Sequence, residues 1–376
     1  MPSPPRSRSG YLPSLDGWRA VAILAVIAVH DAPIVVAGHS LRLLQNYGSL
    51  GVVLFFAISG ILIPWRILEE EWLTGRFHLQ LFYVRRLFRI QPAALVYLAT
   101  VALLAFLGVI SVGWNHWCGA LFMYENFLFH NAPEDWTRGN FTGHFWTLAV
   151  EEHFYLLVSL AFFFIRRHRL RIFVVALVVI KLTQFFVQHA TPDPLLRRTY
   201  WQIHVLLWPT TAALRCPAIR PWAERWLQAG PVLALTAALG AVLYVRSRGT
   251  LLNLLEYAFT PWVVATMLHP TSWPTRILEW RPLRFLGRIS YSFYLWHVLF
   301  FTEGPSASVH SRLLLLLSQR PCKYICSLVA AVASYYLIEK PMIRLGHRLA
   351  PPATAGHKDL LNEPTLPPDS QPAMVS

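Results

Sequence analysis

The sequence predicts an all-α fold, a polytopic membrane helical bundle with about ten transmembrane helices. Of the 376 residues, 55% are hydrophobic and only 14% are charged, whereas about a quarter of the residues in a soluble domain are charged. Apolar runs recur along the chain, and many approach the ~20 residues that an α-helix needs to cross a bilayer. These observations favour one integrated bundle within a lipid bilayer.

Ten apolar runs are predicted to span the membrane. They cover 16–36, 49–66, 92–111, 145–165, 172–190, 201–216, 229–245, 251–268, 288–302 and 322–338. Lysine and arginine gather in alternate connections, a pattern that marks the cytoplasmic side and predicts that both termini are cytoplasmic. The same pattern accounts for the net charge of +14 without a nucleic-acid partner. We expect residues 1–10 and 350–376 to be disordered tails that flank a membrane domain at 11–349.

The first span carries two ionisable side chains, Arg19 and His30. The eleven residues between these positions correspond to about three helical turns, so both side chains lie on one face. Ionisable groups inside a bilayer are costly, and their presence indicates a functional site. The alternative is an interfacial arginine and a packed histidine.

The fourth span contains two adjacent acids, Glu151 and Glu152, with Tyr155 one turn further on. Counted at ~1.5 Å per residue, these acids and His30 lie at a similar depth below the outer surface. A carboxylate beside a histidine orients the imidazole and stabilises its charged form, so the pair predicts a general base. The alternative is an interfacial segment that belongs to an aromatic belt.

Arg86 and Arg89 lie three residues apart on the inner side, before the third span. Arginine side chains suit phosphate and carboxylate oxygens, and Arg19 could join them in a basic mouth. Contact with anionic lipid head groups is the alternative.

His297 lies in the middle of the ninth span, and Glu339 ends the tenth. For His297, a buried structural role is the favoured interpretation, and substrate binding is the alternative. Glu339 is expected to pair with a basic neighbour at the inner face. No pair of cysteines has a CxxC spacing, so we assign neither a disulfide nor a metal site.

Six segments, in order, resemble motifs of the acyltransferase-3 family of integral membrane O-acyltransferases, the bacterial O-acetylase group. They are LDGWRAVAILAVIAVH (15–30), GVVLFFAISGILI (51–63), FYVRRLFRIQP (82–92), HFWTLAVEEHFYLL (144–157), LGRISYSFYLWH (286–297) and IEKPMIRL (338–345). The second motif of the family often has an acid after Gly-Val, where this chain has Val53. That difference puts a polar role at this position in doubt.

The resemblance implies a bundle of about ten helices in the bacterial inner (cytoplasmic) membrane. Cytoplasmic acyl-CoA, with acetyl as the expected group, would be the donor, and no cofactor would be bound permanently. The acceptor would be a hydroxyl of a carbohydrate or glycolipid. Carried over from the family, Arg19, His30, Arg86 and Arg89 would be required, and the Glu151–Glu152 pair would support the centre. Some relatives carry an extra soluble domain, so a separate soluble acyl-handling partner is a further expectation.

A transporter or flippase for lipid-linked glycans is the competing class, because intramembrane histidine, glutamate and arginine also serve proton-coupled transport. Against that class, the sequence shows no repeated halves. Within the enzyme class, two routes stay open for His30. It could accept the proton of the acceptor hydroxyl, or it could carry the acyl group briefly.

Overall fold

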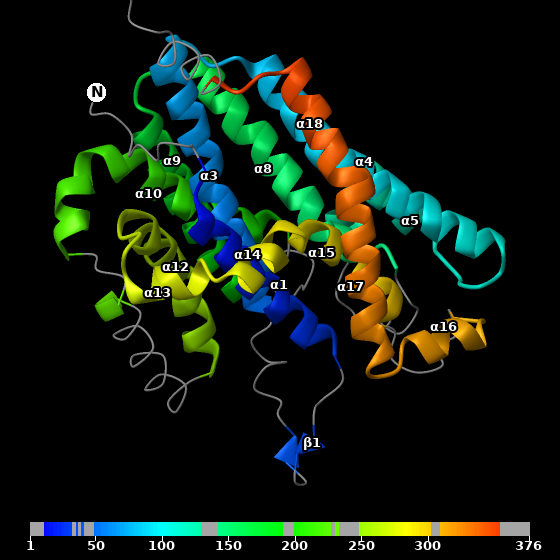
Figure 1. The fold of residues 1–376 in the computed structure, drawn as a ribbon. Coiled ribbons are helices and arrows are strands. Elements are labelled where there is room, and N and C mark those ends of the chain that lie inside the picture. The colour runs from blue at the N-terminus through cyan, green and yellow to red at the C-terminus, as the bar shows by residue number, and fades with distance from the viewer. Residues whose placement is uncertain are drawn as a thin grey trace, which may run out of the picture.

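The computed structural model shows a bundle of helices of unequal length (Figure 1). The residues that the structure describes are 11–31, 35–36, 39–40, 49–128, 141–190, 199–226, 230–232, 248–301 and 309–353. The predicted tail at 1–10, the predicted tail beyond residue 353 and most of the predicted span at 229–245 lie outside them. The helical character of the predicted fold is confirmed.

The helices vary from one turn to more than seven. The longer ones are α1 (Pro13–His30), α3 (Ser49–Thr74), α4 (Leu79–Phe106), α8 (Phe145–Phe164), α9 (Arg169–Ala190), α10 (Thr199–Trp226) and α12 (Arg248–Leu268). The shorter ones are α5 (Trp114–Leu121), α6 (Glu125–Leu128), α13 (Trp273–Leu278), α14 (Arg281–Arg288), α15 (Ser290–Phe300) and α16 (Arg312–Leu317). The last stretch comprises α17 (Cys322–Ser334), the π-helix η2 (Tyr335–Glu339) and α18 (Lys340–Leu349). Two short strands, β1 (Val35–Val36) and β2 (His39–Ser40), pair antiparallel.

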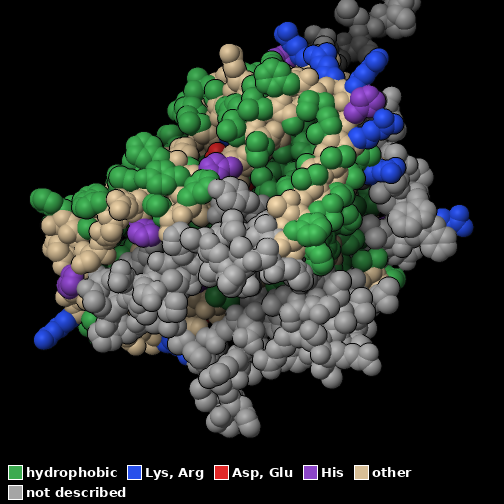
Figure 2. All heavy atoms as spheres, turned by 180° about the vertical axis from the view of Figure 1, so that it is seen from behind, with side chains coloured by type: hydrophobic (Ala, Val, Ile, Leu, Met, Phe, Trp, Pro, Cys, Tyr) green, Lys and Arg blue, Asp and Glu red, His purple; other side chains and the backbone are tan. Residues whose placement is uncertain are grey.

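Four helices of the described part are long and apolar enough to cross a membrane. They are Leu50–Thr74, Leu79–Phe106, Phe145–Phe164 and Cys322–Leu349. Hydrophobic side chains cover much of the upper back face of the molecule, and Lys and Arg side chains gather toward its upper edge (Figure 2). The ends of α3, α8 and α18 reach the same upper end in Figure 1. An apolar flank with basic side chains at one end is typical of a membrane protein.

Helix α4 begins earlier than the sequence predicted. The third span was expected at 92–111, yet α4 runs from Leu79 to Phe106 without a break at Pro92. The charged side chains in its first three turns do not end the helix, because several of them line an interior cavity. A hydropathy pattern detects only the lipid-facing part of such a helix, so the predicted start was too late.

Helix α1 packs against α3, α12, α13, α14 and α15, and it contributes to both apolar cores. Its first half, with Leu15 and Trp18, joins a core built on α3, α8, α10 and α12. Its second half, with Ile23 and Val26, joins a core built on α4, α15 and α17. Both ends of α1 are therefore held by different groups of helices.

Helix α1 crosses both α13 and α14 at very short range. A Cβ atom added at Gly287 would lie 1.8 Å from the Asp16 carbonyl oxygen, and one added at Gly17 would lie 2.2 Å from the Leu278 carbonyl oxygen. Real Cβ atoms do not approach backbone oxygens so closely, so only glycine permits this crossing. The crossing fixes the first turns of α1, which carry Arg19.

Candidate active site

A cavity of about 450 Å³, here called the arginine cavity, opens between the first half of α1, the end of α3, the start of α4 and α18. Its basic lining residues are Arg19, Arg66, Arg85, Arg86, Arg89 and His347. Three acids, Asp16, Glu69 and Glu70, line the same cavity. The structure therefore brings together all three arginines that the sequence predicted for a basic mouth.

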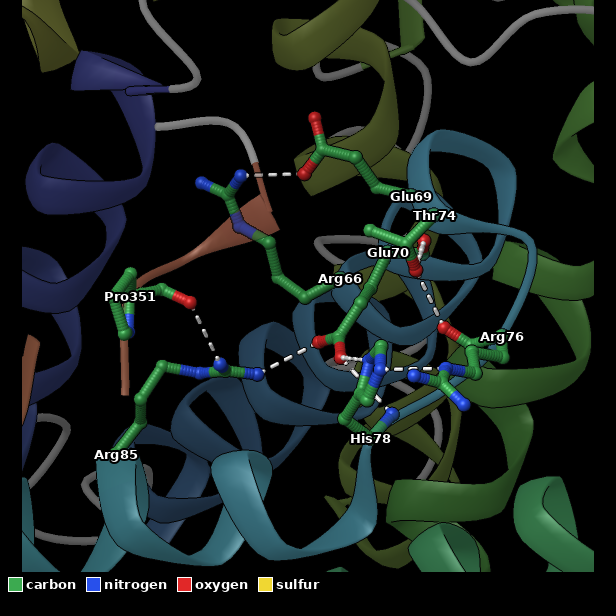
Figure 3. Close-up of polar contacts among 8 residues, drawn as sticks. All are labelled: Arg66, Glu69, Glu70, Thr74, Arg76, His78, Arg85 and Pro351. Atoms are coloured by element: carbon green, nitrogen blue, oxygen red, sulfur yellow. Dashed lines mark hydrogen bonds and ion pairs between the residues drawn. The ribbon is translucent and has the colours of Figure 1, made fainter. Parts of the chain in front are cut away.

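Glu70 holds one side of this cavity together (Figure 3). Its carboxylate accepts hydrogen bonds from Arg85 at 2.7 Å, from His78 Nδ1 at 3.1 Å and from the His78 backbone N–H at 3.0 Å. Arg85 also donates to the Pro351 carbonyl oxygen at 3.4 Å, and Arg66 pairs with Glu69 at 2.7 Å. These arginines are therefore engaged by the protein itself.

Arg86 and Arg89 differ from these partnered arginines, because neither forms an ion pair with a carboxylate among the described residues. The Arg86 guanidinium instead lies over two rings, 5.0 Å from the centre of Tyr155 and 5.7 Å from that of Phe82. Arg19 has a long contact of 3.4 Å with Asp16. Guanidinium groups held in this way keep N–H donors for an anionic ligand.

A second space of about 110 Å³, here called the central cavity, adjoins the first and shares Arg19, Leu62, Arg86 and Arg89 with it. It extends past Glu151, Tyr155 and Glu339 to Thr147 and Tyr294. The two cavities form a path from the basic end of the bundle toward its middle.

Glu151 lies on the wall of the central cavity and accepts hydrogen bonds from the hydroxyl groups of Ser59 and Tyr155. Tyr155 is itself buried, with 3% of its surface exposed. A carboxylate bound by two hydroxyls and close to Arg86 is a fixed element of the cavity wall. Its place supports the prediction that this part of α8 belongs to a polar site.

Beyond Tyr294 lies a group of three imidazoles, here called the histidine cluster: His30, His144 and His297. The ring centres of His30 and His297 are 4.8 Å apart, and those of His144 and His297 are 5.9 Å apart. The Tyr294 ring contacts both His144 and His297, and its hydroxyl group donates to the His144 carbonyl oxygen at 2.9 Å. Neither cavity is lined by His30 or His297, so Tyr294 separates the cluster from the central cavity.

Backbone carbonyl groups fix the tautomers of two of these histidines. His30 Nδ1–H donates to the Val26 carbonyl oxygen at 2.9 Å, and His297 Nδ1–H donates to the Tyr294 carbonyl oxygen at 2.7 Å. In a neutral imidazole with the proton on Nδ1, Nε2 carries a lone pair that can accept a proton. His297 Nε2 is buried and has no hydrogen-bond partner among the described residues. Both rings are thus oriented as acceptors at Nε2.

The predicted contact between His30 and an acid of the fourth span is not among the contacts of the described residues. His30 lies against His297, whereas Glu151 is held by Ser59 and Tyr155. The depth estimate was wrong because His30 is the last residue of α1 and lies level with His144, which precedes α8. The acids follow His144 by seven and eight residues, which places them ~10–12 Å further along the helix.

His297 and Glu339 both form hydrogen bonds inside the bundle. The structural bond expected of His297 is present, and the ring also joins the histidine cluster. Glu339 is buried, accepts from Ser292 at 2.8 Å and lines the central cavity together with two basic neighbours, Arg19 and Arg89, but forms no close ion pair with them among the described residues. The π-turn of η2 carries it there.

His144, Ser59 and Tyr294 were not predicted as site residues. His144 entered only through the alternative of an aromatic belt, although a histidine just before an apolar helix is also a signal of a polar centre. Ser59 and Tyr294 are single polar residues inside apolar helices and give no pattern. Their contacts depend on which helix faces which, and one sequence does not show this.

Comparison with known proteins places this site in context. The acyltransferase-3 family model, described as an acyltransferase domain, matches residues 12–340. The chain is 28% identical over 319 residues to the O-acetyltransferase OatA of Staphylococcus aureus (strain NCTC 8325 / PS 47), which covers 76% of this chain. It is 28% identical over 368 residues, 90% of this chain, to YrhL of Bacillus subtilis (strain 168), whose provisional name is peptidoglycan O-acetyltransferase.

The chain spans about half the length of the curated relatives it matches, 50% of OatA and 56% of YrhL. No solved structure was found to match it.

Proposed function

Because the chain belongs to the acyltransferase-3 family, we propose that it transfers an acyl group from cytoplasmic acyl-CoA to the hydroxyl of a carbohydrate or glycolipid. The donor carbonyl carbon exchanges its bond to the CoA sulfur for a bond to the acceptor oxygen. The hydroxyl proton passes to a base and finally to the thiolate, so that the products are an ester and free CoA. Acetyl is the expected acyl group, since both relatives are named for O-acetyl transfer.

One observation carries this proposal: the arginine cavity and the central cavity share Arg19, Arg86 and Arg89 and lead toward the histidine cluster. The phosphates of acyl-CoA would bind the shared arginines, because guanidinium groups bind phosphate oxygens with paired hydrogen bonds. The pantetheine arm would then follow the central cavity. The rise from Arg19 to His30 is ~16 Å, which a pantetheine arm can span.

Tyr294 lies between the central cavity and the histidine cluster, so we propose that its side chain moves when the thioester arrives. His30 Nε2 would then take the proton of the acceptor hydroxyl or form a transient acyl-imidazole. The Nδ1–H bond to Val26 keeps the ring in the tautomer that either route requires.

The acceptor and the membrane topology complete the proposal. The name of YrhL suggests an acceptor in the cell envelope, such as peptidoglycan. We place the basic end of the bundle in the cytoplasm, with ten spans, both termini cytoplasmic and the whole protein in the bacterial inner membrane. The lower end in Figure 1, where α1 finishes, would then face the acceptor. A separate soluble partner could take over the acyl group there. The transporter class receives no support from the family match.

The test uses the full chain purified in detergent, with acetyl-CoA as donor and free CoA as the readout. His30→Gln should lower the rate of CoA release by about 100-fold or more, because general-base catalysis contributes ~10²–10⁴-fold. Donor binding, measured by calorimetry, should not change. A His30→Gln protein that binds acetyl-CoA and releases CoA at the wild-type rate would exclude His30 as the centre.

A further inference from the structure

The last residue of α1 is followed by Asp31, whose carboxylate binds three side chains from the start of α17 and the turn before it. One oxygen accepts from Lys323 and from Arg320, whose Nη2 lies at 2.9 Å and whose Nε lies at 3.2 Å. The other oxygen accepts from the Tyr324 hydroxyl group. In Figure 1 the C-terminal end of α1 lies beside the lower end of α17. Asp31 thus ties two helices that are almost 300 residues apart in the sequence.

The Asp31–Lys323 pair of this cluster is buried, whereas Arg320 is exposed. Asp31 is 5% exposed and Lys323 is 6% exposed. Charges in such a place persist only when their hydrogen bonds are satisfied, and removing one partner leaves the other unpaired. The cluster therefore resists separation of the end of α1 from α17.

The ion cluster around Asp31 is connected to the His30–His297 contact through one aromatic ring. The Lys323 ammonium lies 4.8 Å from the centre of the Phe301 ring, and Phe301 in turn lies 6.0 Å from His297. Phe301 follows directly after α15, which carries His297, and α15 packs along α17. Helices α1 and α15 are therefore both held against α17 at the level of the two rings.

We propose that Asp31 is a positioning residue: its bonds to Lys323, Arg320 and Tyr324 hold the His30 ring against His297. His30 is the neighbour of Asp31 in the chain, so a shift at Asp31 moves the imidazole directly. Reacting groups must be held within fractions of an ångström, and a misplacement of 1 Å can cost about 100-fold in rate. This inference rests on the proposed function for its catalytic consequence, but not for its geometry.

The geometric test does not depend on activity. In a background with the native cysteines replaced by serine, His30→Cys and His297→Cys are combined and the rate of oxidative disulfide formation is measured. Asp31→Asn should lower this rate several-fold, because the neutral amide binds the two cations more weakly. The matched control is Glu71→Gln, which weakens another interhelical ion pair, the bidentate Arg169–Glu71 contact at 2.6 and 2.7 Å. That control should leave the rate unchanged.

Two outcomes overturn the proposal: no disulfide in the parent pair, or a parent rate that Asp31→Asn does not alter. An equal decrease in the Glu71→Gln variant would also overturn it, since the effect would then be general loosening of the bundle.

The kinetic test uses the full chain with native histidines. Asp31→Asn should lower kcat for acyl transfer about tenfold and leave the KM for acetyl-CoA within about twofold, because the donor binds far from this end of α1. Asp31→Glu, which restores the charge, should recover part of the rate. A change confined to KM, or no recovery with glutamate, would contradict positioning. If the disulfide rates follow the proposal while His30→Gln stays active, the positioning holds and the proposed function fails.

Discussion

The two polar regions of this protein differ in the kind of group they contain. The arginine and central cavities combine guanidinium groups with carboxylates such as Glu70 and Glu151, whereas the histidine cluster contains imidazoles bonded to backbone carbonyls. The first region suits the binding of a charged ligand, and the second suits the movement of a proton. The binding of a charged ligand and the transfer of a proton would thus take place at opposite ends of the same helix, α1.

The largest expected effect concerns the packing of the first end of α1 against α14. Gly287→Ala places a methyl group where the Asp16 carbonyl oxygen lies 1.8 Å away, so α14 must move from α1. We expect the free energy of unfolding to fall by an amount near the top of the range of about 1–3 kcal/mol that is usual for overpacking. Thermal unfolding in detergent measures this loss. Gly113→Ala is the control, since its nearest neighbouring atom is a flexible His116 side-chain carbon at 3.3 Å. Equal melting temperatures for the two variants would contradict the close crossing.

The second prediction concerns the cavity end alone. Arg86→Ala should raise the Kd for acetyl-CoA by about 10–100-fold, which corresponds to about 1.5–3 kcal/mol for hydrogen bonds to a charged group. The rate at saturating donor should change much less. Arg66→Ala is the matched control, because Arg66 lines the same cavity but is paired with Glu69. If both variants weaken binding equally, the cavity attracts the donor by overall charge rather than through the shared arginines.

The third prediction concerns the cluster end alone. His297→Asn should lower kcat for acyl transfer about tenfold and leave the Kd for acetyl-CoA unchanged, because His297 contacts the His30 ring and lines neither cavity. Kinetics at saturating donor and calorimetry measure the two quantities. A variant that binds the donor more weakly would show that the two regions are not separate.

The smallest effect is a pH dependence at the end of α1. The negative charge of Asp31 binds Lys323 and Arg320 in the folded protein. Protonation of the carboxyl group at low pH removes this charge, as Asp31→Asn does at every pH, so the wild type loses its advantage over the variant in acid. The difference in melting temperature between wild type and Asp31→Asn should therefore shrink from about pH 6 to about pH 3. A constant difference would contradict a charged cluster.

The hydropathy pattern predicted the positions of several helices well. The expected spans at 145–165 and 251–268 correspond to α8 and α12 within a few residues, because the apolar run and the helix coincide there. It failed at α4, whose first turns carry arginines that point into a cavity rather than into water. A helix of this kind is apolar on its outside and charged inside, and hydropathy averages the two.

The site could be predicted only in part, because its contacts depend on helix register. Arg19, Arg86 and Arg89 meet as expected, since all three lie near one end of their helices. The pairing of His30 with Glu151 failed because an error of two turns in relative helix height exchanges one partner for another. No feature of a single sequence fixes that height. It is set by contacts such as the glycine crossing of α1 and α14.

The π-turn at Tyr335–Glu339 holds one residue more than an α-helical turn, and the helix continues through it from Cys322 to Leu349. Removing a single residue there would produce a regular helix and leave the direction of α18, with His347 on the arginine cavity, nearly unchanged. Glu339 lies inside the wide turn and would lose its place on the wall of the central cavity. Natural variation in this segment should consequently preserve the extra residue.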